Sequence, residues 1–253
     1  MLTLKAKKEI RWLGEQERGS INTQRLSGLI TGANTKVFKV KHVEDAPSTA
    51  VSLLIDCSGS MKEGRIELAR QVAIAFSEAL NTLAIPNEVI GFNTSARPER
   101  YIDQAQQETG MRQGELLEKF TRFVPIHLTV FKDFNESFKT AGGRFPLMKA
   151  KGLTPLHESM MFAPRRLAVR PETRKVLLVL TDGYPELWPE PGCSMIDEAI
   201  KTVARINKAG IEIIGIGIQT DSVAEIFPQF AVINELSEMP KKFFRELNKV
   251  LAK

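Results

Sequence analysis

The stretch of residues 51–61 reads Val51-Ser52-Leu53-Leu54-Ile55-Asp56-Cys57-Ser58-Gly59-Ser60-Met61. Its first half predicts a buried strand, because a short and nearly continuous apolar run is typical of a strand covered on both faces. The strand delivers Asp56, Ser58 and Ser60 at alternate positions into a turn that Gly59 allows to be tight. Three oxygen-bearing side chains therefore point to one place, which suits a small hard cation.

Strands and helices alternate along the rest of the chain from residue 48. The apolar runs predict strands at 51–55, 87–92, 175–180, 211–218 and 230–233. Apolar residues at helical spacing predict helices at 65–83, 156–168, 195–209 and 241–251. This order predicts an α/β fold with a doubly wound, mostly parallel central sheet and helices on both faces, which is a Rossmann-like arrangement.

Two stretches of the chain are less regular. Residues 1–47 are interpreted as an N-terminal extension, with a helical segment near 5–16 and a β-like segment at 36–40, ahead of a domain at 48–253. Within that domain, residues at about 94–150 are expected to form a helical insert. One helix is suggested by Leu116, Leu117, Phe120 and Phe123, and another by Val130, Phe131, Phe134 and Phe138.

Two more oxygen-bearing residues are expected at the same edge of the sheet. Asp182 follows a strand as Asp56 does, and ligands of parallel sheets gather where the carboxyl ends of the strands meet. Thr154 lies in a loop, Gly152-Leu153-Thr154-Pro155, that leads into a helix. Mg²⁺ prefers such oxygen ligands, and Mn²⁺ and Ca²⁺ accept them too. The five candidate metal ligands are therefore Asp56, Ser58, Ser60, Thr154 and Asp182.

Four of the five candidate ligands, all except Asp56, also have a structural interpretation. A serine can cap the helix that follows, Thr154 before Pro155 is a common helix entry, and Asp182 before Gly183 is a common turn. The metal interpretation gains weight because capping requires one hydroxyl and no distant carboxylate. If the two carboxylates bind the ion largely through water, the ion keeps positive character and favours an incoming carboxylate from a partner. That arrangement is a docking device.

The spaced residues resemble a known family. Asp56-x-Ser58-x-Ser60, a separate Thr154 and then Thr181-Asp182-Gly183 resemble the metal-ion-dependent adhesion site of von Willebrand factor A domains. The resemblance implies the Rossmann-like fold of those domains and a divalent cation, normally Mg²⁺, held by the five candidate ligands.

A finer resemblance covers most of the chain. The segments 50–61, 174–185 and 214–218, together with residues 19–40, are similar to the C-terminal module of the cobaltochelatase T subunit and the segment before it. In that family the subunit works with a ring-forming AAA+ ATPase that serves a large metal-inserting subunit. The resemblance implies a non-catalytic adaptor or co-chaperone that couples ATPase motion to a client through the bound metal.

Two departures from that family are visible. Its subunit usually carries a long acidic region, and nothing before residue 19 matches it, so the chain is expected to be a fragment or a shortened relative. Its module often lacks the threonine of the third loop, whereas Thr154 is present here, as in adhesion-type modules. The second departure favours metal-dependent docking and leaves the chelatase substrate open.

The composition sets the broad class of the protein. Of 253 residues, 43% are hydrophobic and 26% charged, which is ordinary for a soluble globular chain. The apolar runs are far shorter than the roughly 20 residues of a membrane span, and the first residues lack the apolar core of a secretory signal. Two cysteines in this length indicate no disulfide framework, which favours a reducing cytoplasm.

A Pro-rich loop follows Asp182 and carries Tyr184 and Trp188. The loop is expected beside the metal, and an exposed Trp there is a candidate for partner contact. Local packing of these two aromatic side chains is an equal alternative. Cys57, between two candidate ligands, is expected to be a small buried spacer in preference to a redox group.

Two other functions compete with docking. Metal-assisted hydrolysis or phosphoryl transfer at Asp56 is disfavoured, because Ser58 replaces the second acid of an Asp-x-Asp phosphatase motif and no general base is evident. We therefore assign no catalytic residue. Nucleic-acid binding is disfavoured because the net charge of +5 comes from scattered basic residues without interleaved aromatics.

Overall fold

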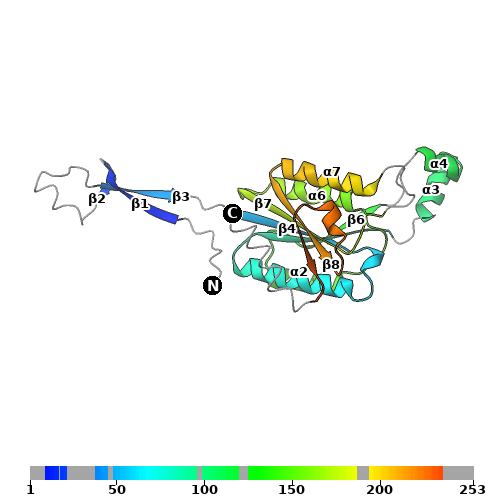
Figure 1. Ribbon diagram of the computed structural model, residues 1–253, viewed down its shortest axis with the longest axis horizontal. Coiled ribbons are helices and arrows are strands. Elements are labelled where there is room, and N and C mark those ends of the chain that lie inside the picture. Colours follow the sequence, from blue (N-terminus) through cyan, green and yellow to red (C-terminus); the bar gives the residue numbers. More distant parts are fainter. Residues whose placement is uncertain are drawn as a thin grey trace, which may run out of the picture. The chain divides into compact units, whose positions relative to one another are not determined.

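The structure is a computed structural model, and it describes residues 9–16, 18–21, 38–44, 48–95, 99–119, 125–186 and 194–235. The chain divides into two compact units, Met1–Ser48 and Thr49–Lys253. Figure 1 labels the main elements of both units.

The first unit contains an antiparallel sheet of three strands in the order β1-β3-β2, with β1 at Glu9–Gln16, β2 at Ser20–Ile21 and β3 at Phe38–Glu44. The helix expected near 5–16 is therefore wrong over the described residues. Ile10 and Trp12 alternate with charged residues, and β1 pairs with β3 from Glu9↔Glu44 onward. The segment is a strand because it pairs with the distant strand β3, and this pairing outweighs its weak helical spacing.

The second unit is built on a sheet of six strands in the order β6-β5-β4-β7-β8-β9. Only the β5/β6 pair is antiparallel. The strands are β4 Thr49–Asp56, β5 Asn87–Thr94, β6 Ile126–Lys132, β7 Arg174–Thr181, β8 Ile211–Ile218 and β9 Phe230–Ile233. From β4 the chain passes first to β5 on one side and later to β7 on the other. The topological switch point, where such sheets bind ligands, thus lies at the carboxyl end of β4.

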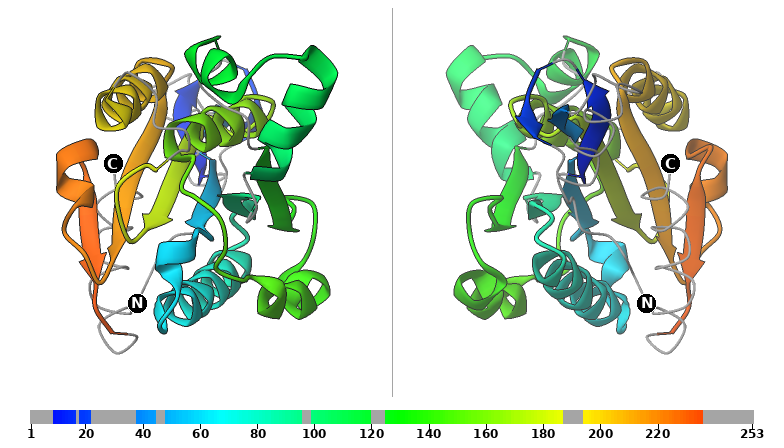
Figure 2. Two further views of the ribbon diagram at one scale, coloured as in Figure 1. Left: turned by 90° about the vertical axis from the view of Figure 1, so that its right-hand side faces the viewer. Right: turned by 90° about the vertical axis from the view of Figure 1, so that its left-hand side faces the viewer.

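Helices cover both faces of this sheet. α2 Arg65–Thr82 lies on one face, and α6 Leu156–Ala168 and α7 Met195–Lys208 lie on the other (Figures 1 and 2). The shorter helical segments are η2 Gly59–Met61, α3 Glu99–Thr109, α4 Gln113–Lys119, α5 Phe138–Ala141, η3 Gly142–Leu147 and α8 Val223–Ile226. None of the helices in the described ranges is long and apolar enough to cross a membrane. The predicted doubly wound α/β fold is confirmed.

The side chains of alternate residues of β4 pack into two separate hydrophobic cores, one on each face of the sheet. Leu53 packs in the cluster that contains Phe76 of α2, whereas Leu54 packs in the cluster that contains Met160 of α6. Both leucines are fully buried. The central strand is therefore apolar on both faces, as its sequence indicated, and it holds the residues that follow it in a fixed position.

The insert expected to be helical contains a strand. Val130 and Phe131 lie in β6, where Ile90 of β5 pairs with Val130. The segment Ile126–Lys132 begins with alternating apolar and polar residues, and burial alternates in the same way, which is the period of a strand. The segment therefore forms a strand, although Val130, Phe131, Phe134 and Phe138 also fit a helical spacing. Phe120, Phe123 and the helix expected at 241–251 lie outside the described residues.

Candidate metal centre

Asp56 ends the central strand and is completely buried. Its Oδ1 accepts a hydrogen bond from the backbone N–H of Ser58 at 2.8 Å, and its Oδ2 accepts one from the hydroxyl of Thr181 at 2.7 Å. The carboxylate is thus held by its own turn and by the end of the neighbouring strand β7. Two donors from separate segments fix its orientation.

A chain of polar contacts leads outward from this carboxylate. The hydroxyl oxygens of Ser58 and Ser60 are 2.9 Å apart, and the Ser60 hydroxyl donates to Asp182 Oδ1 at 2.8 Å. Ser58 is buried, whereas Ser60 is exposed. The contacts bring together residues that are 122 positions apart in the sequence. Four of the five candidate ligands therefore share one polar cluster at the switch point.

Thr154 reaches the same edge through backbone contacts of its loop. The N–H of Gly59 donates to the carbonyl oxygen of Gly152 at 2.8 Å, which joins this loop to the turn after β4. Thr154 in turn exchanges two backbone hydrogen bonds with Glu186, each of 3.0 Å, in the segment after β7. Gly152 has a φ of +72°, and a Cβ there would collide with the carbonyl of Thr94. The loop can therefore approach the sheet this closely only with glycine at that position.

Burial dominates the electrostatics of this edge. It raises the pKa of Asp56 to about 6, although hydrogen bonds from Ser58 and Thr181 act in the opposite direction. Burial likewise raises the pKa of the Cys57 thiol to about 12. The Cys57 thiol is therefore neutral, as a buried spacer would be, and is a poor nucleophile. The Asp56 carboxylate gains from any nearby positive charge.

Two residues of this cluster were not singled out by the sequence. Thr181 was noted only as the neighbour of Asp182, yet its hydroxyl holds Asp56. Arg65, at the start of α2, donates to Asp182 Oδ2 at 3.3 Å and to the carbonyl oxygen of Ser60 at 3.0 Å. A hydroxyl directly before the strand-end acid was a usable signal for Thr181. No pattern in the sequence indicated Arg65.

The loop after Asp182 is described in part. Tyr184 is 48% exposed, and its hydroxyl donates to Glu225 of α8 at 2.7 Å. Trp188 lies outside the described residues. Partner contact by these two side chains stays a prediction.

A cation held by this cluster would need hydroxyl oxygens among its ligands. Within the described ranges, no three His, Cys, Asp or Glu side chains gather closely enough to hold a metal ion. The two carboxylates at the switch point, Asp56 and Asp182, would therefore act with the hydroxyls of Ser58, Ser60 and Thr154. Such a donor set is compatible with Mg²⁺, which binds few carboxylates and keeps several waters.

Sequence comparison finds one family and several relatives. The model of the family described as "Cobalamin biosynthesis protein CobT VWA domain" matches residues 37–253. The uncharacterized protein YojO of Bacillus subtilis (strain 168) is 22% identical over 93% of this chain and 35% of its own length. Protein NorD of Brucella abortus (strain 2308) is 25% identical over 46% of this chain and 19% of its own length. The chain therefore matches about a third or less of these relatives.

Solved structures show the same fold at low identity. The vWF domain of the type V pili tip protein Mfa5 from Porphyromonas gingivalis superimposes with a TM-score of 0.58 at 9% identity, covering 81% of this chain and 97% of that one. The pilus adhesin SpaC from Lactobacillus rhamnosus GG gives 0.53 at 15% identity, covering 83% and 31%. Identities this low establish a shared fold and nothing about partners.

Proposed function

Because the chain belongs to the family of the cobalamin biosynthesis protein CobT VWA domain, we propose that it is a non-catalytic, Mg²⁺-dependent docking module. The five candidate ligands hold the ion, and the ion captures an acidic side chain of a protein partner. The partner is an AAA+ ATPase or the client of that ATPase.

The observation that carries the proposal is the contact chain from Ser58 through Ser60 to Asp182. It gathers hydroxyl and carboxylate oxygens from two strands at the switch point of the sheet, where ligands of doubly wound folds bind. A simple helix cap would explain one of these hydroxyls, but not their contact with a carboxylate from β7.

The chemistry of the residues present fits a divalent cation. Burial raises the pKa of Asp56 and so disfavours its ionised form, which a nearby cation would favour. Bound Mg²⁺ would contribute a positive charge with an open coordination position for a partner's carboxylate. Mn²⁺ and Ca²⁺ offer the same chemistry with less demanding geometry.

The hydrogen bonds of Asp56 argue for recognition over turnover. Both carboxylate oxygens already accept hydrogen bonds, from Ser58 and from Thr181, and the group is completely buried. A carboxylate held in this way serves as a fixed anchor for a cation. It is poorly placed to attack a phosphoester, which is the step that the hydrolase alternative requires.

The identity of the partner rests on the family. The cobaltochelatase T subunit, which this chain resembles, works with a ring-forming AAA+ ATPase. Since the chain spans about a third of YojO and a fifth of NorD, the activities and partners of such whole proteins remain proposals for this chain. The cytoplasmic location also stays a prediction.

Retention of an AAA+ ATPase tests the proposal. The tagged full chain is incubated with a lysate of its native host in Mg²⁺ or in EDTA, and retained ATPases are identified by mass spectrometry. We expect retention in Mg²⁺ that is lost in EDTA and in Asp56→Ala. Asp56→Asn, which keeps the side-chain volume, is a second variant in case Asp56→Ala fails to fold.

Asp103→Ala is the matched control, because Asp103 is an exposed carboxylate on α3 and is not one of the candidate ligands. Retention in EDTA and in both folded Asp56 variants would contradict docking through the metal. Turnover of phosphoesters by the purified chain in Mg²⁺, lost in Asp56→Asn, would instead support the hydrolase.

A further inference from the structure

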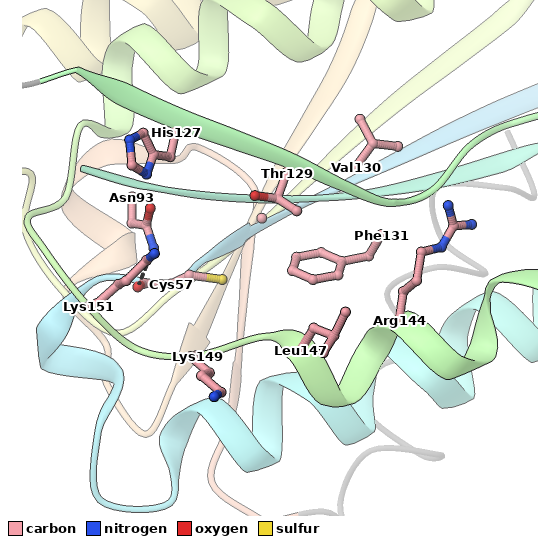
Figure 3. Close-up of a pocket in the computed structure, with 11 residues that line it drawn as sticks. Cys57, Asn93, His127, Thr129, Val130, Phe131, Arg144, Leu147, Lys149 and Lys151 are labelled. Atoms are coloured by element: carbon pink, nitrogen blue, oxygen red, sulfur yellow. Dashed lines mark hydrogen bonds between the residues drawn. The ribbon is translucent and has the colours of Figure 1, made fainter. Parts of the chain in front are cut away.

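A pocket of about 220 Å³ opens beside the candidate metal centre (Figure 3). It lies between the β5–β6 part of the sheet and the segment that runs from η3 towards the Thr154 loop. Phe131, Leu147 and the thiol of Cys57 give it an apolar wall, and the Cys57 sulfur points into it in Figure 3. Leu147 is 65% exposed, so its side chain is accessible to a ligand at the edge of the pocket.

The charged residues that line this pocket are all basic. Arg144 is already neutralised by Glu136, with which it forms an ion pair. Lys149 and Lys151 are exposed, and neither forms an ion pair with a carboxylate of the described residues. The pocket therefore combines an apolar wall with two uncompensated ammonium groups.

The pocket shares its walls with the segments that carry the candidate ligands. Cys57 lies between Asp56 and Ser58, and its carbonyl oxygen accepts hydrogen bonds from the Lys151 N–H at 2.8 Å and from Asn93 Nδ2 at 3.2 Å. Lys151 directly precedes the Gly152 loop that joins Gly59. A protein segment bound at the metal would thus pass close to this pocket.

We infer that this pocket is a second recognition site, which takes the side chain of a glutamate from the same acidic partner segment that docks at the metal. Its carboxylate pairs with Lys149 and Lys151, and its methylene stem lies against Leu147 and Phe131. The inference rests on the proposed function only for the identity of the partner. The pocket itself binds the glutamate side chain without metal.

The size of the pocket favours a single side chain. Pockets for drug-sized ligands and cofactors typically occupy roughly 300–1,000 Å³, so this one is too small for a nucleotide or a large macrocycle. A carboxylate paired with lysines gives charge-assisted hydrogen bonds, which are stronger than neutral ones. An apolar wall adds selectivity for a carboxylate on a hydrocarbon stem over a free inorganic anion, which has no stem to bury.

Titration of the full chain with acetyl-glutamate amide in EDTA tests the pocket alone. We expect saturable NMR shifts at the amides of Thr129, Leu147 and Lys151, and none with the neutral acetyl-glutamine amide. The double variant Lys149→Met, Lys151→Met should weaken binding about tenfold, since charge-assisted hydrogen bonds are lost. Lys208→Met, which removes an exposed lysine at the end of α7, should bind normally.

Three results would overturn the inference: no saturable shift at these amides, unchanged binding by the folded double variant, or tighter binding of inorganic phosphate than of acetyl-glutamate amide. The last result would mark a site for free phosphate. The variant Leu147→Ser tests the contribution of the apolar wall. It should weaken the binding of acetyl-glutamate amide without changing the affinity for phosphate.

A second titration separates this inference from the proposed function. It uses peptides that carry two glutamates at increasing separation, with Mg²⁺ or with EDTA. If both proposals hold, one separation binds best in Mg²⁺, because linked contacts reinforce each other, and either EDTA or the double lysine variant removes the gain. If binding requires Mg²⁺ but is unchanged in the double lysine variant, the pocket does not bind the second glutamate. If binding is lost in the double lysine variant but is the same in Mg²⁺ and in EDTA, docking does not occur through the metal.

Discussion

The guanidinium of Arg65 forms an ion pair with Asp182 at the candidate metal centre. It donates to Asp182 Oδ2, while the other oxygen of that carboxylate accepts from Ser60. The Arg65 side chain is 37% exposed, whereas that of Asp182 is 2% exposed. If a cation binds at this edge as proposed, it would compete with Arg65 for the carboxylate, and the partly exposed arginine could move into solvent.

Replacing Arg65 by methionine should tighten Mg²⁺ binding. The variant keeps the apolar stem but removes the competing charge, and the gain should be about fivefold, because an ion pair whose arginine is partly exposed contributes roughly 1 kcal/mol. Isothermal titration with MgCl₂ measures it.

Lys62→Met is the control for net charge, since Lys62 is an exposed cation in the same turn. Equal tightening in both variants would show that Arg65 acts only through the overall charge. Weaker binding in Arg65→Met would mean that the arginine supports the site.

The candidate ligands could be predicted from the sequence, whereas the contact of Arg65 could not. The spacing of Asp56, Ser58 and Ser60 follows from their place after a buried strand, so their proximity was predictable. Arg65 contacts the Ser60 carbonyl oxygen across a turn in which Glu63 and Gly64 take positive φ values of 60° and 90°. Gly64 was a usable signal for a positive φ, but the positive φ of Glu63 and the contact of Arg65 with Ser60 were not predictable from the sequence pattern.

Among the elements, β4, β5 and α6 are joined by a partly buried ion cluster near the amino ends of the two strands. Glu88 is completely buried, accepting a hydrogen bond from Ser52 at 2.8 Å and an ion-pair contact from Arg166 at 2.6 Å. Arg166 also reaches Asp133 at 2.6 Å. Burial raises the pKa of Glu88, and the hydrogen bond from Arg166 lowers it in part. The arginine therefore carries much of the compensation for a charge inside the fold.

Substituting Arg166 by methionine should destabilise the protein by about 3 kcal/mol at neutral pH, because it leaves a buried carboxylate unpaired. Without the arginine the pKa of Glu88 rises further. A carboxyl whose pKa is raised by folding binds more protons in the folded than in the unfolded state, so stability falls as pH rises through that range. The loss should be smaller at about pH 4.5 than at about pH 8, as urea unfolding at the two pH values would measure.

Arg165→Met is the matched control, since Arg165 is exposed on the same helix. It should change the free energy of unfolding by less than about 0.5 kcal/mol at either pH. A loss in Arg166→Met that does not depend on pH would show that packing of the arginine stem matters more than its charge.

Helices and strands were predicted most accurately where the hydrophobic pattern of the sequence is long and regular. Helix α6 and strand β8 were predicted with the bounds that the structure shows, because each is long and strongly patterned. Strand β6 was mistaken for helix, because Val130, Phe131, Phe134 and Phe138 also fit a helical spacing. The alternation from Ile126 onward was the better signal, and antiparallel pairing with β5 made it decisive.

At the scale of the whole molecule, the boundary between the two units and the boundary of the family match differ. The units divide between Ser48 and Thr49, whereas the family match begins at residue 37, just before β3. Strand β3 pairs with β1 and β2, which precede it in the chain. Sequence alone suggested a boundary near residue 48, where the regular pattern starts. It could not show the pairing within the extension, because that depends on contacts between distant residues.

These pairings predict how the chain can be shortened. A fragment of residues 49–253 keeps the six-stranded sheet and both cores, so we expect it to be monomeric and to melt within about 3 °C of the full chain, a difference below about 1 kcal/mol. A fragment of residues 37–253 keeps β3 without its partners β1 and β2, and an unpaired strand edge promotes association. It should therefore elute from size-exclusion chromatography at a larger, concentration-dependent size. Equal behaviour of the two fragments would mean that β3 does not need its sheet, and a large loss of melting temperature in the 49–253 fragment would show that the first unit stabilises the second.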